Sequence, residues 1–264
     1  MNENNIKEEK NNNENTHTYD NGFHPKEVTL KPDYVFYHHG FWFWLINKIT
    51  VYVSSFFLFF PKFFWWGFRV KGKKNKKHIK SCLIISNHTL PSDIFLIKTS
   101  IKTKKVYMTS LQSNMGFGLI STYFRWGGAV PIPDDMGMLL KFNKRTYDEI
   151  KRGSSILFYP EAALVPYCDH IRPFMPGVFH YAYGSTKKIV PMVFTYHKPK
   201  GWYKLTRRGK SVVHLNILVP YYMDDNINKK LSMEKAKNEL EKIMGDYFIK
   251  NSDFYYDKDG NKIN

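Results

Sequence analysis

The segment Asn-His-Thr-Leu-Pro-Ser-Asp at residues 87–93 places a histidine and a carboxylate at a spacing that suits proton transfer. His88 follows the apolar run 81–86, which is typical of a buried strand, and Asp93 stands five residues later in a predicted helix start. A chain that turns from a strand into a helix can bring such a pair together, so that the carboxylate holds one imidazole nitrogen while the other faces a cleft. The spacing therefore predicts a general base, His88, oriented by Asp93.

Taken alone, the pair has a plainer interpretation. A histidine at a strand end can hydrogen-bond locally, and an aspartate in the first turn of a helix is favourable beside the helix dipole without any catalytic role. Such pairs also arise by chance in a chain with 10 histidines. Further motifs are needed to decide between the two interpretations.

Three further blocks follow in order. The first is the glycine-led apolar run Gly-Gly-Ala-Val-Pro-Ile-Pro-Asp at 127–134, and the second is Phe-Tyr-Pro-Glu-Ala at 158–162, which places Glu161 at a predicted strand end. The third is Val-Pro-Met at 190–192, and Arg-Pro-Phe-Met-Pro-Gly at 172–177 lies between the second and the third. Glu161 alone could also be a carboxylate of a surface loop.

With His88 and Asp93, these blocks resemble the lysophosphatidic acid acyltransferase superfamily over about residues 65–220. The resemblance implies transfer of a fatty acyl group from an acyl thioester to the hydroxyl of a lysophospholipid such as 1-acylglycerol-3-phosphate. The thioester would be acyl-CoA or acyl carrier protein, used as a co-substrate. The resemblance assigns catalysis to His88 and Asp93, and acceptor binding to Asn87, Glu161 and Arg172.

Two blocks depart from the family pattern. The first run ends in Asp134 where the family has an arginine, and Ala162 and Ala163 stand where glycine and serine or threonine are usual. A carboxylate repels the acceptor phosphate that the arginine would hold. Either another cation such as Arg172 or Arg125 substitutes, or the acceptor is a different alcohol, for example another lysolipid or a glycolipid.

The cysteines and histidines do not indicate other chemistry. Cys82 lies in an apolar run, where a small hydrophobic residue fits, and Cys168 stands beside Asp169, which raises the pKa of a thiol. We therefore expect neither a disulfide nor a cysteine nucleophile. No metal and no bound cofactor are implied, since the histidines are scattered and no cysteine or histidine pair has ligand spacing.

The elements that must position these residues follow from the pattern beyond residue 80. Their order favours one α/β domain at 81–264, with a mixed, mostly parallel sheet flanked by helices. Pro91 suits a first helical turn, Gly153 a helix end and Ser232 an N-cap. The predicted strands are 81–86, 105–109, 128–132, 154–159, 189–196 and 212–220, and the predicted helices are 91–101, 136–151, 178–183 and 232–248.

The N-terminal part divides into three segments. Residues 1–30 are polar and nearly free of aliphatics, so we expect a disordered tail, and they lack the features of a secretory signal. Residues 31–68 contain the aromatic run 41–60, of membrane length, which would end at Pro61. The run could span the bilayer or lie in its interface, and both stay open because Lys48 would be costly at mid-bilayer. A buried core helix is the alternative.

The basic cluster at 69–80 predicts contact with anionic lipid. The alternative is a solvated loop.

Composition fits a membrane setting. Aromatic residues are 17% of the chain, and the formal net charge is +17 although residues 1–30 hold six acidic residues and three lysines. Such a field attracts anionic lipid, phosphates, acidic carrier proteins or nucleic acid. We expect an enzyme at the cytoplasmic face of a membrane, and no nucleic-acid partner because no binding module is present. A basic, non-enzymatic membrane or nucleic-acid binder and a catalytically inactive relative stay open as alternatives.

Overall fold

Strands and helices alternate through the computed structural model, which describes residues 27–65, 67–102, 105–208, 210–253, 255–256 and 262–263. The strands are β1 (Arg69–Lys71), β2 (Cys82–Ser86), β3 (Val106–Leu111), β4 (Ala129–Ile132), β5 (Ser155–Phe158), β6 (Lys188–His197), β7 (Val212–Ile217), β8 (Tyr221–Tyr222), β9 (Tyr255–Tyr256) and β10 (Lys262–Ile263). The helices are α2 (Phe41–Phe60), α3 (Asp93–Ile101), α4 (Leu119–Trp126), α5 (Met136–Lys151), α6 (Phe179–Tyr183), α7 (Tyr203–Arg207) and α8 (Lys229–Asn251). Shorter helical segments are η1 (Pro61–Trp65), η2 (Lys73–His78), η3 (Gln112–Gly116) and η4 (Pro176–Val178).

The central sheet is mixed and mostly parallel. Its strand order is β1-β7-β6-β2-β5-β3-β4, and β8 pairs with β6. β2 runs parallel to β5 and β6, β3 runs parallel to β4 and β5, and β1 runs parallel to β7, whereas β6 is antiparallel to β7 and β8. The predicted α/β fold with a mixed, mostly parallel sheet flanked by helices is confirmed.

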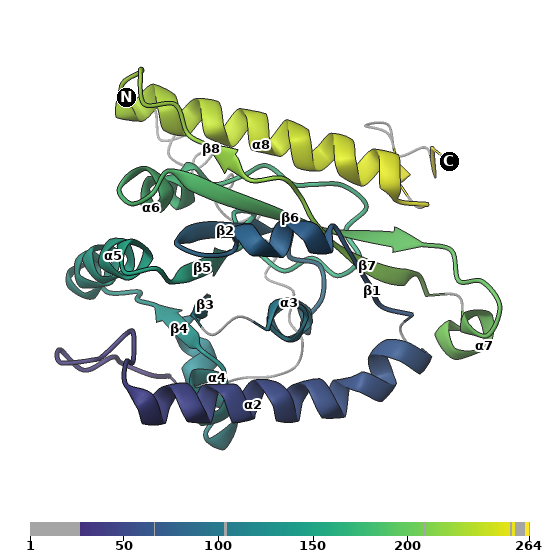
Figure 1. Cartoon of the computed structure of the whole chain (residues 1–264), viewed down its shortest axis with the longest axis horizontal. Helices are drawn as coiled ribbons and strands as arrows, with labels where there is room; N and C mark the ends of the chain where they lie inside the picture. The colour runs from purple at the N-terminus through teal and green to yellow at the C-terminus, as the bar shows by residue number, and fades with distance from the viewer. Residues whose placement is uncertain are drawn as a thin grey trace, which may run out of the picture.

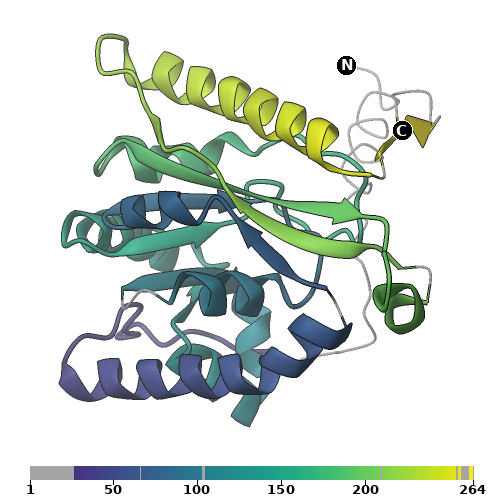
Figure 2. The ribbon, with the colours of Figure 1, turned by 45° about the vertical axis from the view of Figure 1, so that its right-hand side comes forward.

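The order of the connections places helices on both faces of the sheet. From β2 the chain moves outward to β3 and β4 through α3 and α4, and then returns to β5 and β6 through α5 and α6. Because parallel crossovers are right-handed, these opposite directions put α3 and α4 on one face and α5 and α6 on the other. α2 packs on α3 and α4, and α8 packs on α6 and β6. Figures 1 and 2 show α2 and α8 on opposite sides of the molecule.

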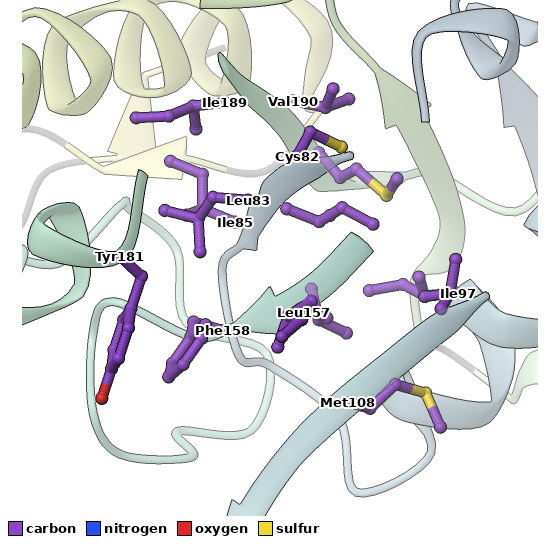
Figure 3. Close-up of a cluster of buried hydrophobic side chains, with 14 of the residues drawn as sticks. Cys82, Leu83, Ile85, Ile97, Met108, Leu157, Phe158, Tyr181, Ile189 and Val190 are labelled. Carbon is purple, nitrogen blue, oxygen red and sulfur yellow. The ribbon is translucent and has the colours of Figure 1, made fainter. Parts of the chain in front are cut away.

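The core is centred on β2, whose five residues are all buried. Figure 3 shows Leu83 and Ile85 of β2 beside Leu157 and Phe158 of β5, with Met108 of β3 close to them. Helices cover both faces of this sheet, so both faces of its central strands are apolar. Such strands are continuous hydrophobic runs in the sequence, and they could therefore be predicted. Cys82 belongs to this core, and both it and Cys168 are free thiols.

The N-terminal apolar run lies along the domain instead of projecting from it. Together α2 and η1, Phe41–Trp65, are long and apolar enough to cross a membrane by length and composition. Yet the buried residues of α2 are the polar Asn47, Thr50 and Ser54, whereas Phe56 and Phe57 are 72% and 71% exposed. The polarity of α2 is therefore inverted relative to a helix on the surface of a water-soluble domain.

Hydrogen bonds hold the polar face of α2 against α4. Asn47 Nδ2 donates to the carbonyl oxygen of Trp126 at 2.6 Å, and the hydroxyl oxygens of Ser54 and Tyr123 lie 2.5 Å apart. A helix tied to its own domain in this way keeps its aromatic face turned away from the domain.

The N-terminal boundaries differ from those predicted. Residues 1–26 of the expected tail lie outside the described residues, but Leu30 is buried in the core. Phe36 and Tyr37 are also buried, and the Tyr37 hydroxyl lies 2.7 Å from that of Thr146. Residues 31–40, expected to be part of a membrane anchor, therefore belong to the packed domain.

The bounds predicted for the apolar run are those of α2, Phe41–Phe60, and past Pro61 the chain continues as a π-helical turn to Trp65. In the basic segment 69–80, Arg69–Lys71 form the edge strand β1, paired with β7. Part of the expected lipid-contact cluster is thus built into the sheet.

Gly72 occupies a turn that only glycine fits. Its φ is 67°, and a Cβ at this position would overlap the carbonyl oxygen of Ile217 in β7. Gly72→Ala is expected to lower the free energy of unfolding by about 1–3 kcal/mol or more, because it adds backbone strain to a clash. Gly245→Ala in α8 is the matched control: a Cβ there meets nothing within 4 Å, so it should raise stability by about 1 kcal/mol. Urea denaturation followed by circular dichroism measures both, and effects of equal sign would contradict the prediction.

Candidate active site

The predicted site residues lie where the connections of two adjacent parallel strands diverge. β2 and β5 pair in register, with Ile85 opposite Phe158, and their connections lead to α3 on one face and α6 on the other. Such a switch point opens a crevice outside the carboxyl ends of the strands. His88 follows β2 and Glu161 follows β5, so the fold brings these two blocks of sequence together.

The side chains of His88 and Asp93 face each other. His88 Nδ1 lies 3.3 Å from Asp93 Oδ2, and the same oxygen accepts hydrogen bonds from the backbone N–H groups of Thr89 at 2.7 Å and Leu90 at 2.9 Å. The Asp93 side chain is fully buried, whereas that of His88 is 24% exposed. Burial raises the pKa of Asp93, and the hydrogen bonds from His88 and the backbone oppose this. The carboxylate is thus fixed and occupies Nδ1, which leaves Nε2 as the nitrogen available for proton transfer.

Tyr159 stacks on the imidazole of His88. The ring centroids are 4.0 Å apart and the planes are inclined by 18°. Burial raises the pKa of Tyr159 well above its ordinary value, and its hydroxyl has no hydrogen-bond partner among the described residues. The stacking restrains the plane of the His88 ring. Sequence reasoning did not single out Tyr159, although it immediately precedes Pro160 and Glu161.

Glu161 ties the two strand ends together. Its Oε2 accepts from the backbone N–H of His88 at 3.2 Å and from Arg172 Nη2 at 2.8 Å, and its Oε1 accepts from the backbone N–H of Arg172 at 3.2 Å. Burial raises the pKa of Glu161, and the guanidinium of Arg172 opposes this. Neither side chain lines the cavity described below. Glu161, which with Arg172 is predicted to bind the acceptor, holds the backbone N–H of His88, and Arg172 holds Glu161; we call this pair the clamp on His88.

Asn87, also predicted to bind the acceptor, is hydrogen-bonded to β6. It is fully buried, its Nδ2 donates to the carbonyl oxygen of Phe194 at 3.2 Å, and its Oδ1 accepts from the Phe194 N–H at 2.8 Å. Both ends of the amide are therefore committed to β6, and the side chain does not reach the cavity. Asn87 anchors the strand end that carries His88.

The site opens into a cavity of about 730 Å³ that His88 lines. Met108 and Thr109, which point to opposite faces of β3, both line it, so the cavity reaches both faces of the sheet at this edge. One arm runs under α2 and along one face of α3. Its lining includes Thr50, Val51, Ser54, Ile94, Phe95, Lys98 and Thr99. The other arm lies between α5 and α6 and includes Leu139, Asn143, His180 and Tyr181.

Among the described residues that line this cavity, no arginine replaces the family's arginine at the end of the block 127–134. Asp134 is exposed beyond β4, and Arg125 Nη2 lies 2.7 Å from His38 Nε2, with its guanidinium over the ring of Tyr34. Arg125 and Arg172 are absent from the cavity lining. Among the described residues, the basic side chains that line it are His88, Lys98 and His180.

Ala162 shows why glycine is usual at the end of the block 158–162. Its φ is 58°, in the left-handed region that glycine adopts freely and other residues rarely do. Its N–H donates to the carbonyl oxygen of Tyr159 at 3.1 Å, which closes the turn after β5. The turn is therefore kept in this chain in spite of the substitution, with some local strain.

Cys168, Asp169 and His170 are the one group among the described residues whose ligand atoms, all within 4.8 Å of one another, are close enough to share a metal ion. They are consecutive in a loop, and His170 Nδ1 already lies 2.7 Å from Asp169 Oδ1. None of the three lines the cavity. The chemistry of the site therefore does not depend on them.

Lys98 is a buried cation in the wall of the cavity, which the sequence showed only as a lysine within an apolar helix. It is 4% exposed, and its ammonium donates to the carbonyl oxygen of Val106. Burial lowers its pKa to about 7. Between pH 7 and the ordinary pKa of lysine, the unfolded chain therefore binds more protons than the folded chain at this position, and stability rises with pH.

Lys98→Met is accordingly expected to stabilise the protein most at and below pH 7. The advantage over the unsubstituted protein should shrink as the pH rises toward 10. The unfolded chain then also loses the proton of Lys98, so a neutral Lys98 in the folded chain no longer costs stability. Urea denaturation at a series of pH values measures the difference. Lys242→Met, at an exposed position of α8, is the control and should show no such trend. A pH-independent difference for Lys98→Met would contradict the prediction.

Comparison with known proteins gives two matches. The family model described as Acyltransferase matches residues 67–195. The structure is similar to that of the 1-acyl-sn-glycerophosphate (LPA) acyltransferase PlsC from Thermotoga maritima, with a TM-score of 0.51, 14% sequence identity and coverage of 80% of this chain and 97% of that chain. At this identity the likeness concerns the fold alone. No curated protein matches the sequence.

Proposed function

We propose that this chain, which matches the Acyltransferase family model over residues 67–195, esterifies the hydroxyl of a lysophospholipid, such as 1-acylglycerol-3-phosphate, at a membrane surface. The acyl group comes from acyl-CoA or an acyl carrier protein. The predicted superfamily resemblance and the predicted enzyme class are confirmed. The donor, the acceptor, the site residues and the cytoplasmic face belong to the proposal.

The observation that carries the proposal is the geometry of His88, which lines the cavity while Asp93 Oδ2 holds its Nδ1 at 3.3 Å. His88 Nε2 takes the proton of the acceptor hydroxyl as that oxygen attacks the thioester carbonyl carbon. The ester C–O bond forms, the C–S bond breaks, and the leaving thiolate takes the proton from the imidazolium. Asp93 stabilises the transient positive charge, and no acyl-enzyme is formed.

The cavity offers a place for each hydrophobic partner. The arm under α2 is walled by apolar residues of α3, such as Ile94 and Phe95, and suits an acyl chain. Because α2 supplies part of this wall while its aromatic face points outward, lipid can approach from the bilayer side. The excess of basic residues would attract an anionic donor, and it supports a position of the domain on an anionic, cytoplasmic leaflet.

A second candidate acceptor is a lysolipid or glycolipid without a phosphate monoester. What favours it is the position of Asp134, together with the absence of Arg125 and Arg172 from the cavity lining. A dianionic phosphate monoester is usually held by a guanidinium or by several cations. Within the described lining only Lys98 and two histidines are basic.

The test is a transfer assay with purified full-length protein in detergent micelles. Labelled acyl-CoA and acyl carrier protein thioesters are each offered with lysophosphatidic acid, lysophosphatidylcholine and a lysoglycolipid, and the lipid products are identified by mass spectrometry. We expect one new ester product, absent with His88→Ala. Lack of transfer to every acceptor would overturn the enzymatic proposal and favour a catalytically inactive, membrane-binding relative.

A further inference from the structure

The outward face of α2 continues onto two other elements. Leu119 and Ile120 of α4 are 89% and 55% exposed, and Trp202 and Leu205, at the start of α7 and within it, are 62% and 70% exposed. In Figures 1 and 2, α2, α4 and α7 all lie toward the side of the molecule away from α8. α7 lies in the connection between β6 and β7, far along the chain from the N-terminal apolar run.

α7 is fixed against the end of η1. The Tyr203 hydroxyl donates to the carbonyl oxygen of Phe63 at 2.7 Å. The Thr206 hydroxyl donates to the carbonyl oxygen of Trp65 at 3.5 Å. A Cβ at Gly67 would lie 3.2 Å from the Tyr203 ring, so glycine permits this close packing. Trp202, the neighbour of Tyr203, stays 62% exposed.

The charged residues of the segment 198–210, which carries α7, are all basic: it contains six basic residues and no acidic residue. Five of the basic side chains, Lys198, Lys200, Lys204, Arg208 and Lys210, are exposed. A tryptophan and a leucine surrounded by exposed cations are the composition of a segment that sits at the headgroup boundary of an anionic bilayer.

We propose that α7 and its flanking loop are a second membrane-contact element, which together with α2 and α4 seats the domain in one leaflet of an anionic phospholipid bilayer. The proposal deepens the proposed function, since it rests on a site that takes its lipid at a membrane surface. α7 reaches the bilayer from the β6–β7 connection and α2 from the N-terminal run, so the domain has contacts at two places and its orientation is fixed. With this orientation, the cavity arm under α2 lies next to the leaflet.

The test is co-sedimentation of the full-length chain with phosphatidylcholine vesicles, with and without phosphatidylglycerol. Trp202→Glu with Leu205→Glu should lower the vesicle partition coefficient at least about tenfold, because each apolar side chain buried is worth a tenfold or larger change. Leu231→Glu with Ile249→Glu is the matched control: these residues are 51% and 45% exposed on α8, on the other side of the molecule, and binding should be unchanged.

A second variant tests the charges. Lys200→Gln, Lys204→Gln and Arg208→Gln together should weaken binding to vesicles with phosphatidylglycerol by at least about tenfold and leave binding to pure phosphatidylcholine nearly unchanged. Trp202→Gln with Leu205→Gln replaces the same apolar side chains without adding charge. Its fold is checked by circular dichroism, so that a loss of vesicle binding can be told from a folding defect. Unchanged vesicle binding in the α7 variants, or an equal loss in the α8 variant, would overturn the proposal.

The two proposals fail separately. In detergent micelles, acyl transfer to a soluble short-chain lysolipid should be the same for the α7 variants and the unsubstituted protein. If no variant transfers an acyl group but vesicle binding still depends on α7, the proposed function fails and the membrane contact stands. If the α7 variants bind vesicles normally but lose transfer only from acyl carrier protein, the segment docks an acidic protein and the membrane contact is wrong.

Discussion

His88→Ala is expected to lower kcat for acyl transfer about 10²- to 10⁴-fold while folding and vesicle binding stay unchanged. Among the described residues that line the cavity, the imidazole is the group held by a buried carboxylate, through Nδ1 and Asp93 Oδ2 at 3.3 Å. Removing it leaves the acceptor hydroxyl without a base but keeps the cavity walls and α2 in place. Steady-state kinetics with a labelled thioester and the preferred lysolipid measure the effect.

His180→Ala is the matched control for this prediction. His180 lines the same cavity, but its Nδ1 donates to the carbonyl oxygen of Gly177 rather than to a carboxylate. Its loss should change kcat by less than about tenfold, since it is not oriented as a base. Asp93→Asn should resemble His88→Ala, because the amide accepts the bonds from Thr89 and Leu90 but cannot stabilise an imidazolium. Similar kinetics for His88→Ala and the unsubstituted enzyme would end the assignment.

Glu161→Gln is expected to lower both activity and stability. Breaking a buried ion pair by removing one partner costs about 3–5 kcal/mol, and the 18% exposure of the Arg172 side chain suggests the lower end of this range. The substitution also weakens the bond from the backbone N–H of His88 to Oε2, so the ring loses its support and kcat falls. Urea denaturation and kinetics on the same preparation give both quantities.

The double variant Glu161→Gln with Arg172→Met separates the two effects. It removes the uncompensated guanidinium, so stability should recover in large part, whereas kcat should stay low because the clamp on His88 is still missing. If Glu161 instead bound the acceptor directly, KM would rise while kcat and stability changed little. That result would favour acceptor binding by Glu161, the role predicted from the sequence.

The layers of the fold could be predicted because its central strands are buried on both faces. Runs such as 81–86 and 154–159 are continuous and apolar, and α5 was predicted with its observed bounds, Met136–Lys151. The start of α8 was misplaced, because Asn228 caps the helix by accepting from the Leu231 N–H at 3.0 Å, whereas Ser232 donates to the Asp224 carbonyl oxygen. The edge strand β1 has three residues, one apolar, and its pairing with β7 leaves no local signal.

The site was predictable as a set of residues but not as a set of roles. The spacing of His88 and Asp93 follows from a local turn, so their contact could be foreseen. The partners of Asn87 and Glu161 are set by β6 and by the loop that carries Arg172, which depend on long-range pairing. A polar residue beside a catalytic histidine has the same sequence signal whether it binds substrate or supports the backbone.

The inverted polarity of α2 also bears on how the chain is made. α2 leaves the ribosome before α3 and α4, the elements that cover Asn47, Thr50 and Ser54. β6, which completes the centre of the sheet, is synthesised more than a hundred residues after α2. Under the proposed membrane contact, the aromatic side of α2 would therefore be available to a bilayer before the strands that complete the sheet are synthesised.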